Sequence, residues 1–258
     1  MTSTLLVAGV TGLLALDTRA VGRFLLGEPL FVGTIIGIVL GDPMTGLSLG
    51  AWFQLLWIHL LPEGAVTPPD GSVPTATAVA LVVGLTPRVA LPPQALVMVV
   101  MVLTIPLGFV SRWLEIHLKD WFARLSEWGD VYAYHGQTLS IARVVGLAVW
   151  AEWMKAAGLT AVAVGAGMAV LPRIIASLPQ PMCDGLALSY WFIIPLGLAV
   201  MLELMNVPNK FRLFLLSFLG ISLAYGMFQA ARPLLFTGAM AIGLLYVRWV
   251  HRPRKLLV

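Results

Sequence analysis

Eight polar side chains lie in strongly apolar surroundings, and they are the residues with which this chain could do chemistry. They are Asp42, Gln54, His59, Glu63, Asp70, Asp184, Glu203 and Asn206. If the surroundings are a lipid bilayer, such groups are costly and mark functional sites by default. Because five of them fall within residues 42–70, we expect a site in that stretch.

Gln54 lies in the middle of an apolar run, with Trp52 and Trp57 close to it in the sequence. An amide both donates and accepts hydrogen bonds, and aromatic rings stack on the C–H face of a sugar, so the combination suits a polyhydroxylated ligand. The alternative is a hydrogen bond between two helices. Asp70, which follows Pro69, has two interpretations as well: a turn residue or a partner for sugar hydroxyls.

Asp42 lies in a Gly-Asp-Pro turn and is expected to cap the helix that begins near Met44. His59 and Glu63 are one helical turn apart. They could pair at a helix end or line the same site as Gln54, and both interpretations stay open.

Motifs of metal-dependent and covalent catalysis are missing from the sequence. His59 and Glu63 lack the second histidine of a zinc motif, and no Walker loop, nucleophile elbow or dinucleotide fingerprint is present. We therefore expect no metal, no cofactor and no enzyme activity. Two alternatives remain: an intramembrane enzyme acting on a lipid-linked substrate, with His59 and Asp70 as acid and base, or a structural or receptor subunit that transports nothing.

The composition is that of a multi-pass membrane protein. Of 258 residues, 59% are hydrophobic and 11% are charged, whereas soluble domains carry about 25% charge. Seven lysines and arginines follow Glu203, the last acid, which predicts a cytoplasmic C-terminus rather than nucleic-acid binding. The single cysteine, Cys183, excludes an intramolecular disulfide.

The elements expected around residues 42–70 are short and broken. The apolar run at 30–40 is too short to cross a bilayer, which needs roughly 20 residues, and a turn separates it from the run at 47–61. Interrupted hydrophobic segments point to the binding site of a transporter. Glycines recur along both runs, at Gly33, Gly37, Gly41, Gly46 and Gly50. They predict a tight helical hairpin, although helix packing alone would explain them.

The sequence predicts an all-α polytopic membrane protein that forms a single domain over 1–258. Re-entrant hairpins are expected in residues 1–110, an amphipathic connector over 111–136 that lies on the membrane or against a partner, a transmembrane bundle over 137–250 and a basic tail over 251–258. Asp17 is expected to cap an amphipathic segment that ends at Glu28. The other helices are expected at 4–16, 75–85, 94–110, 138–157, 158–176, 185–206, 211–230 and 233–250.

The stretch from Leu16 to Asp70 resembles the IIC subunit of the mannose/sorbose-type phosphotransferase system. The matching features are Leu16-Asp17, Pro29-Leu30, Gly37, Gly41-Asp42, Gly46, Gly50, Gly64-Ala65 and Pro69-Asp70. Residues 178–205 are similar too, with a proline, then Gly185, then a span that ends near Met205.

The resemblance implies a permease of the bacterial inner membrane that passes a hexose or an amino sugar across the lipid together with a IID subunit. Soluble IIA and IIB subunits would phosphorylate the sugar on the cytoplasmic side, and the membrane subunits would form an oligomer. Substrate-binding roles carry over to Gln54 and Asp70. From their positions in the sequence, we also predict Glu63 and His59 as substrate-binding residues. The family usually has glutamate at position 54 and often asparagine at position 62, so the sugar and its coupling to phosphorylation stay open.

Overall fold

The computed structural model describes residues 2–18, 20, 22, 24–57, 67–193 and 195–197. The chain forms two compact units, Met1–Met201 and Leu202–Val258, and every described residue belongs to the first. His59, Glu63 and Gly64 lie outside the described residues, as do Glu203, Asn206, the helices expected beyond residue 197 and the basic tail.

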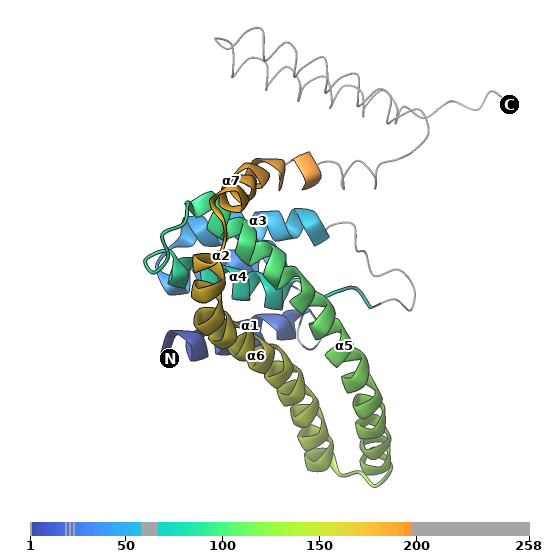
Figure 1. The fold of residues 1–258 in the computed structure, drawn as a ribbon. Helices are drawn as coiled ribbons and strands as arrows, with labels where there is room; N and C mark the ends of the chain where they lie inside the picture. Colours follow the sequence, from blue (N-terminus) through green and yellow to red (C-terminus); the bar gives the residue numbers. More distant parts are fainter. Residues whose placement is uncertain are drawn as a thin grey trace, which may run out of the picture. The chain divides into compact units, whose positions relative to one another are not determined.

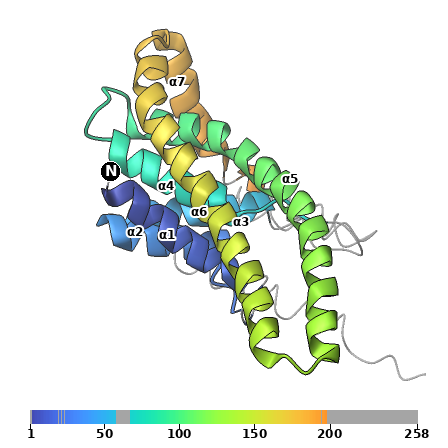
Figure 2. The ribbon, with the colours of Figure 1, turned by 90° about the horizontal axis from the view of Figure 1, so that it is seen from below.

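The described part consists of helices and the turns that join them, which confirms the all-helical expectation for that part. They are α1 (Thr2–Asp17), α2 (Pro29–Leu40), α3 (Pro43–Trp57), α4 (Ser72–Leu85), α5 (Pro93–Tyr134), α6 (Thr138–Ala176), α7 (Gln180–Ser189) and the 3₁₀ turn η1 (Tyr190–Phe192). Figures 1 and 2 show α5 and α6 leaving the group of α1–α4 side by side, as a long antiparallel hairpin.

Helices α2 and α3 form the predicted hairpin. Pro29 opens α2, where its missing N–H leaves no bond unmade, and Gly41 ends α2 in the left-handed conformation with φ +84°. Asp42 then caps α3: its carboxylate accepts the hydroxyl of Thr45 at 2.6 Å and the backbone N–H of Thr45 at 3.1 Å. These two hydrogen bonds confirm the predicted cap.

The glycines of the hairpin bring the two backbones into direct contact. A Cβ atom on Gly33 would lie 2.5 Å from the carbonyl oxygen of Gly46, and one on Gly37 would lie 2.8 Å from the Cα of Gly46. On Gly50, it would lie 2.7 Å from the carbonyl oxygen of Pro29. No side chain fits at these distances, so the tight approach predicted from the glycine spacing is confirmed.

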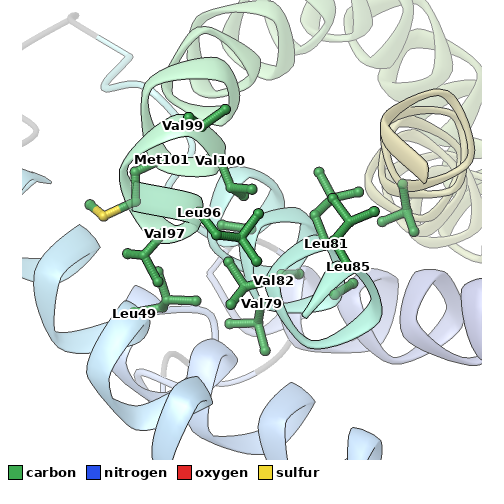
Figure 3. Packing of buried hydrophobic residues seen from close by; sticks show 14 of the residues in the cluster. Leu49, Val79, Leu81, Val82, Leu85, Leu96, Val97, Val99, Val100 and Met101 are labelled. Carbon is green, nitrogen blue, oxygen red and sulfur yellow. The ribbon is translucent and has the colours of Figure 1, made fainter. Parts of the chain in front are cut away.

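Helix α4 is the centre of the core. It is buried along nearly its whole length, as expected of a helix that is apolar on every side. Figure 3 shows Val79, Val82 and Leu85 of α4 beside Leu96 and Val100 of α5. On its other side, α4 meets α6.

Two helices of the described part, α5 and α6, are long and apolar enough to cross a membrane by length and composition. Helices α1, α2 and α4 are apolar but have only 16, 12 and 14 residues, fewer than the roughly 20 that a straight span needs.

The prediction of an amphipathic helix between Asp17 and Glu28 is wrong for the residues that the structure describes there. Asp17 ends α1, and its carboxylate accepts the backbone N–H groups of Phe24 and Leu26, both at 2.8 Å. Leu25 has a φ of +68°, which a right-handed helix does not contain. Asp17 therefore anchors an irregular turn in front of α2 instead of capping a helix.

The helix boundaries in the second half also differ from those predicted. The two helices expected at 138–157 and 158–176 are one helix, α6. A glycine inside a helix costs only about 1 kcal/mol, so Gly158 does not end it. Helix α5 likewise continues from the expected span through the amphipathic stretch. Helix α7 begins at Gln180 rather than at residue 185, because Pro181 fits in a first helical turn.

Replacing Gly46 by alanine tests the hairpin. The new Cβ would collide with the carbonyl oxygen of Gly33, so we expect overpacking to remove about 1–3 kcal/mol of stability and to lower the unfolding temperature of the detergent-solubilised protein. Gly165→Ala in α6 is the matched control, since a Cβ there meets nothing within 4 Å. Equal unfolding temperatures of the two variants would contradict the close contact of α2 and α3.

Candidate functional site

Asp70 organises the turn that leads into α4. One carboxylate oxygen accepts the backbone N–H of Ser72 at 2.9 Å and its hydroxyl at 2.7 Å. The other oxygen accepts the hydroxyl of Ser111 in α5 at 2.7 Å. Ser72 and Ser111 are 2% and 0% exposed, so these bonds are shielded from water. The turn-forming interpretation of Asp70 is therefore correct, and its carboxylate already has three donors.

The segment just before α4 is fastened along α5 at two further points. The backbone N–H of Asp70 donates to the carbonyl oxygen of Gly108 at 3.2 Å. Lys119 donates to the hydroxyl of Thr67 at 2.7 Å and lies 3.8 Å from Glu115. Pro69 lies between these contacts. The polar face of α5 thus holds residues 67–70 in place, although the sequence suggested only a surface or partner role for that face.

Gln54 joins the end of α3 to the beginning of α2. Its side-chain oxygen accepts the backbone N–H of Leu30 at 3.3 Å, and its side-chain nitrogen donates to the carboxylate of Glu28 at 3.0 Å. Leu30 lies in the first turn of α2, where backbone N–H groups have no helical acceptor. The bond between two helices, one of the two interpretations of Gln54, is therefore present.

Gly71, which follows Asp70, packs against Trp57 and Pro29, which lie near Gln54. A Cβ on Gly71 would lie 2.6 Å from Cδ1 of Trp57 and 2.7 Å from Cγ of Pro29. Pro29 lies between the two residues that bind Gln54, and Gly71 directly follows Asp70. The two polar residues singled out in the sequence thus belong to one group of contacts, which we call the α2–α4 junction: Glu28, Pro29, Gln54, Trp57, Asp70 and Gly71.

The indole of Trp57 is a donor available at this junction. Its ring packs against Phe53 and Phe109, with centroids 6.2 and 6.4 Å away. Its Nε1 is buried and has no hydrogen-bond acceptor among the described residues. A buried N–H of this kind normally has a partner, so a ligand oxygen would satisfy it.

The other tryptophan near Gln54 lies at a different place. Trp52 packs edge-on against Tyr190 at a centroid distance of 4.8 Å. Together with Ser48, Gln94 and Val97, these rings line a separate cavity of about 230 Å³. Only Trp57 therefore belongs to the α2–α4 junction.

The remaining expected site residues either lie outside the described part of the chain or lie on other elements. His59, Glu63 and Gly64 lie outside the described residues, so their roles stay predictions. Asp184 is exposed on α7. Within the described part of the chain, no group of three or more histidine, cysteine, aspartate or glutamate side chains could hold a metal ion.

The sequence reasoning missed three charged groups. Glu28 was assigned to an amphipathic segment, and its contact with Gln54 joins residues 26 positions apart. Glu152 and Lys155 form an ion pair inside α6, with side chains 5% and 3% exposed. Their positions in a long apolar run were a signal that could have found them, because such charges are rarely buried unless paired.

The fold and the junction define a class of protein. Long apolar helices, short apolar helices joined by capped turns, and amide and carboxylate groups gathered between them are features of a multi-pass membrane transporter. The family model for the sorbose-specific IIC component of the phosphotransferase system matches residues 1–245. The chain belongs to this family and is a IIC permease component of the mannose/sorbose type.

Curated relatives agree with this membership. The chain is 24% identical over 224 residues to the fructose permease IIC component of Bacillus subtilis, covering 83% of this chain and 76% of the relative. It is 22% identical over 197 residues to the mannose-specific EIIC component of Escherichia coli K12, covering 76% and 71%. The sorbose-specific EIIC component of Klebsiella pneumoniae is 25% identical over 211 residues, again covering 76% and 71%.

Two solved structures share the fold. A structure described as a membrane protein has a TM-score of 0.64 and 20% identity, covering 92% of this chain and 94% of the other. The mannose transporter ManYZ, solved in complex with a microcin, has a TM-score of 0.55 and 19% identity, covering 96% and 94%. At these identities the likeness concerns the fold.

Asp70→Ala tests the tether at the junction. The change leaves the buried hydroxyls of Ser72 and Ser111 without their acceptor, so we expect a loss of about 1–3 kcal/mol for each donor left unsatisfied. Thermal unfolding of the solubilised protein measures it. Asp70→Ala combined with Ser111→Ala should cost less than the sum of the two single changes. Strict additivity would show that the two side chains do not interact.

Lys155→Met tests the ion pair in α6. Removing one partner of a buried pair typically costs about 3–5 kcal/mol, whereas replacing both partners costs far less. We therefore expect Lys155→Met to unfold at a lower temperature than the double variant Glu152→Gln/Lys155→Met. If the single variant is as stable as the wild type, the pair is not shielded from water.

Proposed function

We propose that the chain binds a hexose or an amino sugar at the α2–α4 junction and passes it across the inner membrane to a IIB subunit for phosphorylation. It works with a IID membrane subunit and with the IIA and IIB phosphocarriers, as part of an oligomer among membrane lipids, and its C-terminus is cytoplasmic. The chain itself transfers no phosphoryl group.

One observation carries the proposal. The junction joins an amide, two carboxylates and an indole N–H that lacks an acceptor among the described residues, on helices too short to cross the lipid. Sugars are bound by planar polar side chains that accept and donate hydrogen bonds, together with aromatic rings that stack on their C–H faces. The relatives include fructose, mannose and sorbose permease components, which favours a hexose.

The hairpin of α2 and α3 is the element that we propose to be re-entrant. At 1.5 Å per residue, 12 residues of α2 reach about 18 Å, against a hydrocarbon thickness of about 30 Å. Broken backbone is tolerated at such depth only where it is buried in protein or lines a wet cavity. The polar junction, where Gln54 reaches Glu28 and Leu30, lies at the open end of this hairpin.

Sugar uptake tests the site assignment. The chain is expressed with its IID, IIA and IIB partners in cells that lack other hexose transporters, and a panel of labelled hexoses and amino sugars is offered with and without IIB. We expect Gln54→Ala and Asp70→Ala to lower uptake by about tenfold or more. Gln54→Ala removes the donor that faces Glu28, and Asp70→Ala removes the acceptor that holds Ser72 and Ser111 at the junction. His59→Ala and Glu63→Ala test the two positions outside the described residues.

Gln180→Ala is the matched control, because Gln180 is an exposed amide on α7. The amount of each variant in the membrane is measured beside its uptake, so that lost transport is separated from lost protein. Unchanged uptake by both Gln54→Ala and Asp70→Ala would show that the sugar binds elsewhere. Turnover of a lipid-linked substrate by the purified chain alone would favour an intramembrane enzyme.

A further inference from the structure

The two carboxylates of the junction are used differently. Asp70 directs both oxygens at serine donors of the protein. Glu28 accepts a single hydrogen bond, from Gln54 to its Oε2 at 3.0 Å, and its Oε1 accepts none from the residues that the structure describes. Glu28 is therefore the carboxylate with capacity left for a ligand.

Gln54 determines the direction in which Glu28 points. The amide oxygen of Gln54 is occupied by the backbone N–H of Leu30, so its nitrogen must face Glu28. Reversing the amide would lose both bonds, since oxygen cannot donate and nitrogen cannot accept. The register of the hairpin brings these groups together, because Gly50, one turn before Gln54, touches the backbone of Pro29 and Leu30.

We propose that Glu28 is the specificity-determining carboxylate of the sugar site and that Gln54 is its positioning residue. This inference rests on the proposed sugar-binding function. Glu28 accepts hydrogen bonds from ligand hydroxyls and attracts the ammonium of an amino sugar. The one carboxylate of this pair lies on the residue that faces position 54 at the start of α2.

A competing explanation assigns Glu28 a purely structural role. It precedes α2, and an acid at a helix N-terminus stabilises the helix dipole. That role predicts an effect on stability and none on the choice between a charged and a neutral sugar. Selectivity between glucosamine and glucose, which differ by one amino group, separates the two explanations.

Glu28→Gln is the first variant, because it removes the charge, keeps the volume and still offers an oxygen to the amide of Gln54. We expect the uptake ratio of glucosamine to glucose to fall by about tenfold, the loss typical of one hydrogen bond to a charged group. The measurement uses the chain co-expressed with IID, IIA and IIB. Glu127→Gln, an exposed carboxylate on α5, is the control and should keep the wild-type ratio.

An exchange of the two groups tests the positioning role of Gln54. Gln54→Glu alone places a second carboxylate in contact with that of Glu28, and two adjacent carboxylates cannot both ionise without a free-energy cost. We therefore expect this variant to lower uptake by about tenfold or more. Glu28→Gln/Gln54→Glu has one amide and one carboxylate again, in exchanged positions. We expect this double variant to regain uptake and the preference for glucosamine.

The outcomes are distinguishable. Normal wild-type uptake with an unchanged ratio in Glu28→Gln would overturn the role of Glu28 and leave sugar transport standing. A double variant no better than Gln54→Glu would overturn the positioning role of Gln54. If the wild type takes up no sugar of the panel with its partners present, the proposed function fails and this inference fails with it.

Discussion

Direct contact between the backbones of α2 and α3 is the constraint on which the rest of the site depends. Gly33 and Gly37 face Gly46 and Gly50 so closely that no Cβ fits between the helices. The close approach of the two backbones places the side chain of Gln54 within hydrogen-bonding distance of the first turn of α2. The two heavy atoms of an N–H···O hydrogen bond typically lie about 2.7–3.2 Å apart. A larger residue in the seam would therefore act on the polar junction without touching it.

The hairpin could be predicted from the sequence because its causes are local. A glycine at every fourth position defines one face of a helix, a Gly-Asp-Pro turn ends one helix and caps the next, and Pro29 marks a helix start. Each signal lies within a few residues of the structure that it predicts. For the same reason, the stretch that holds Gln54 and Asp70 could be recognised from the order of its residues alone.

The remaining errors come from contacts between residues distant in the sequence. The residues between Asp17 and Glu28 have the pattern of an amphipathic helix. The carboxylate of Asp17 instead accepts the backbone N–H groups of Phe24 and Leu26, and such tertiary hydrogen bonds override the helical pattern. The contact between Glu28 and Gln54 depends on the register of α2 against α3. This register cannot be read from the sequence of either helix alone. The apolar run around Lys155 indicated that it is buried, whereas the face of α6 that packs against other helices could not be predicted from its spacing to Glu152.

An amide and a carboxylate, from Gln54 and Glu28, face each other at the junction. Two carboxylates at hydrogen-bond distance cannot both ionise without a large cost, so a chain with glutamate at position 28 needs a donor opposite it. Glutamine supplies that donor through its amide nitrogen and keeps an oxygen for the first turn of α2. The residue at position 54 is thus determined by the residue at position 28 and by the helix end between them. Position 54 taken alone carries no charge, whereas the pair of Gln54 and Glu28 includes one carboxylate.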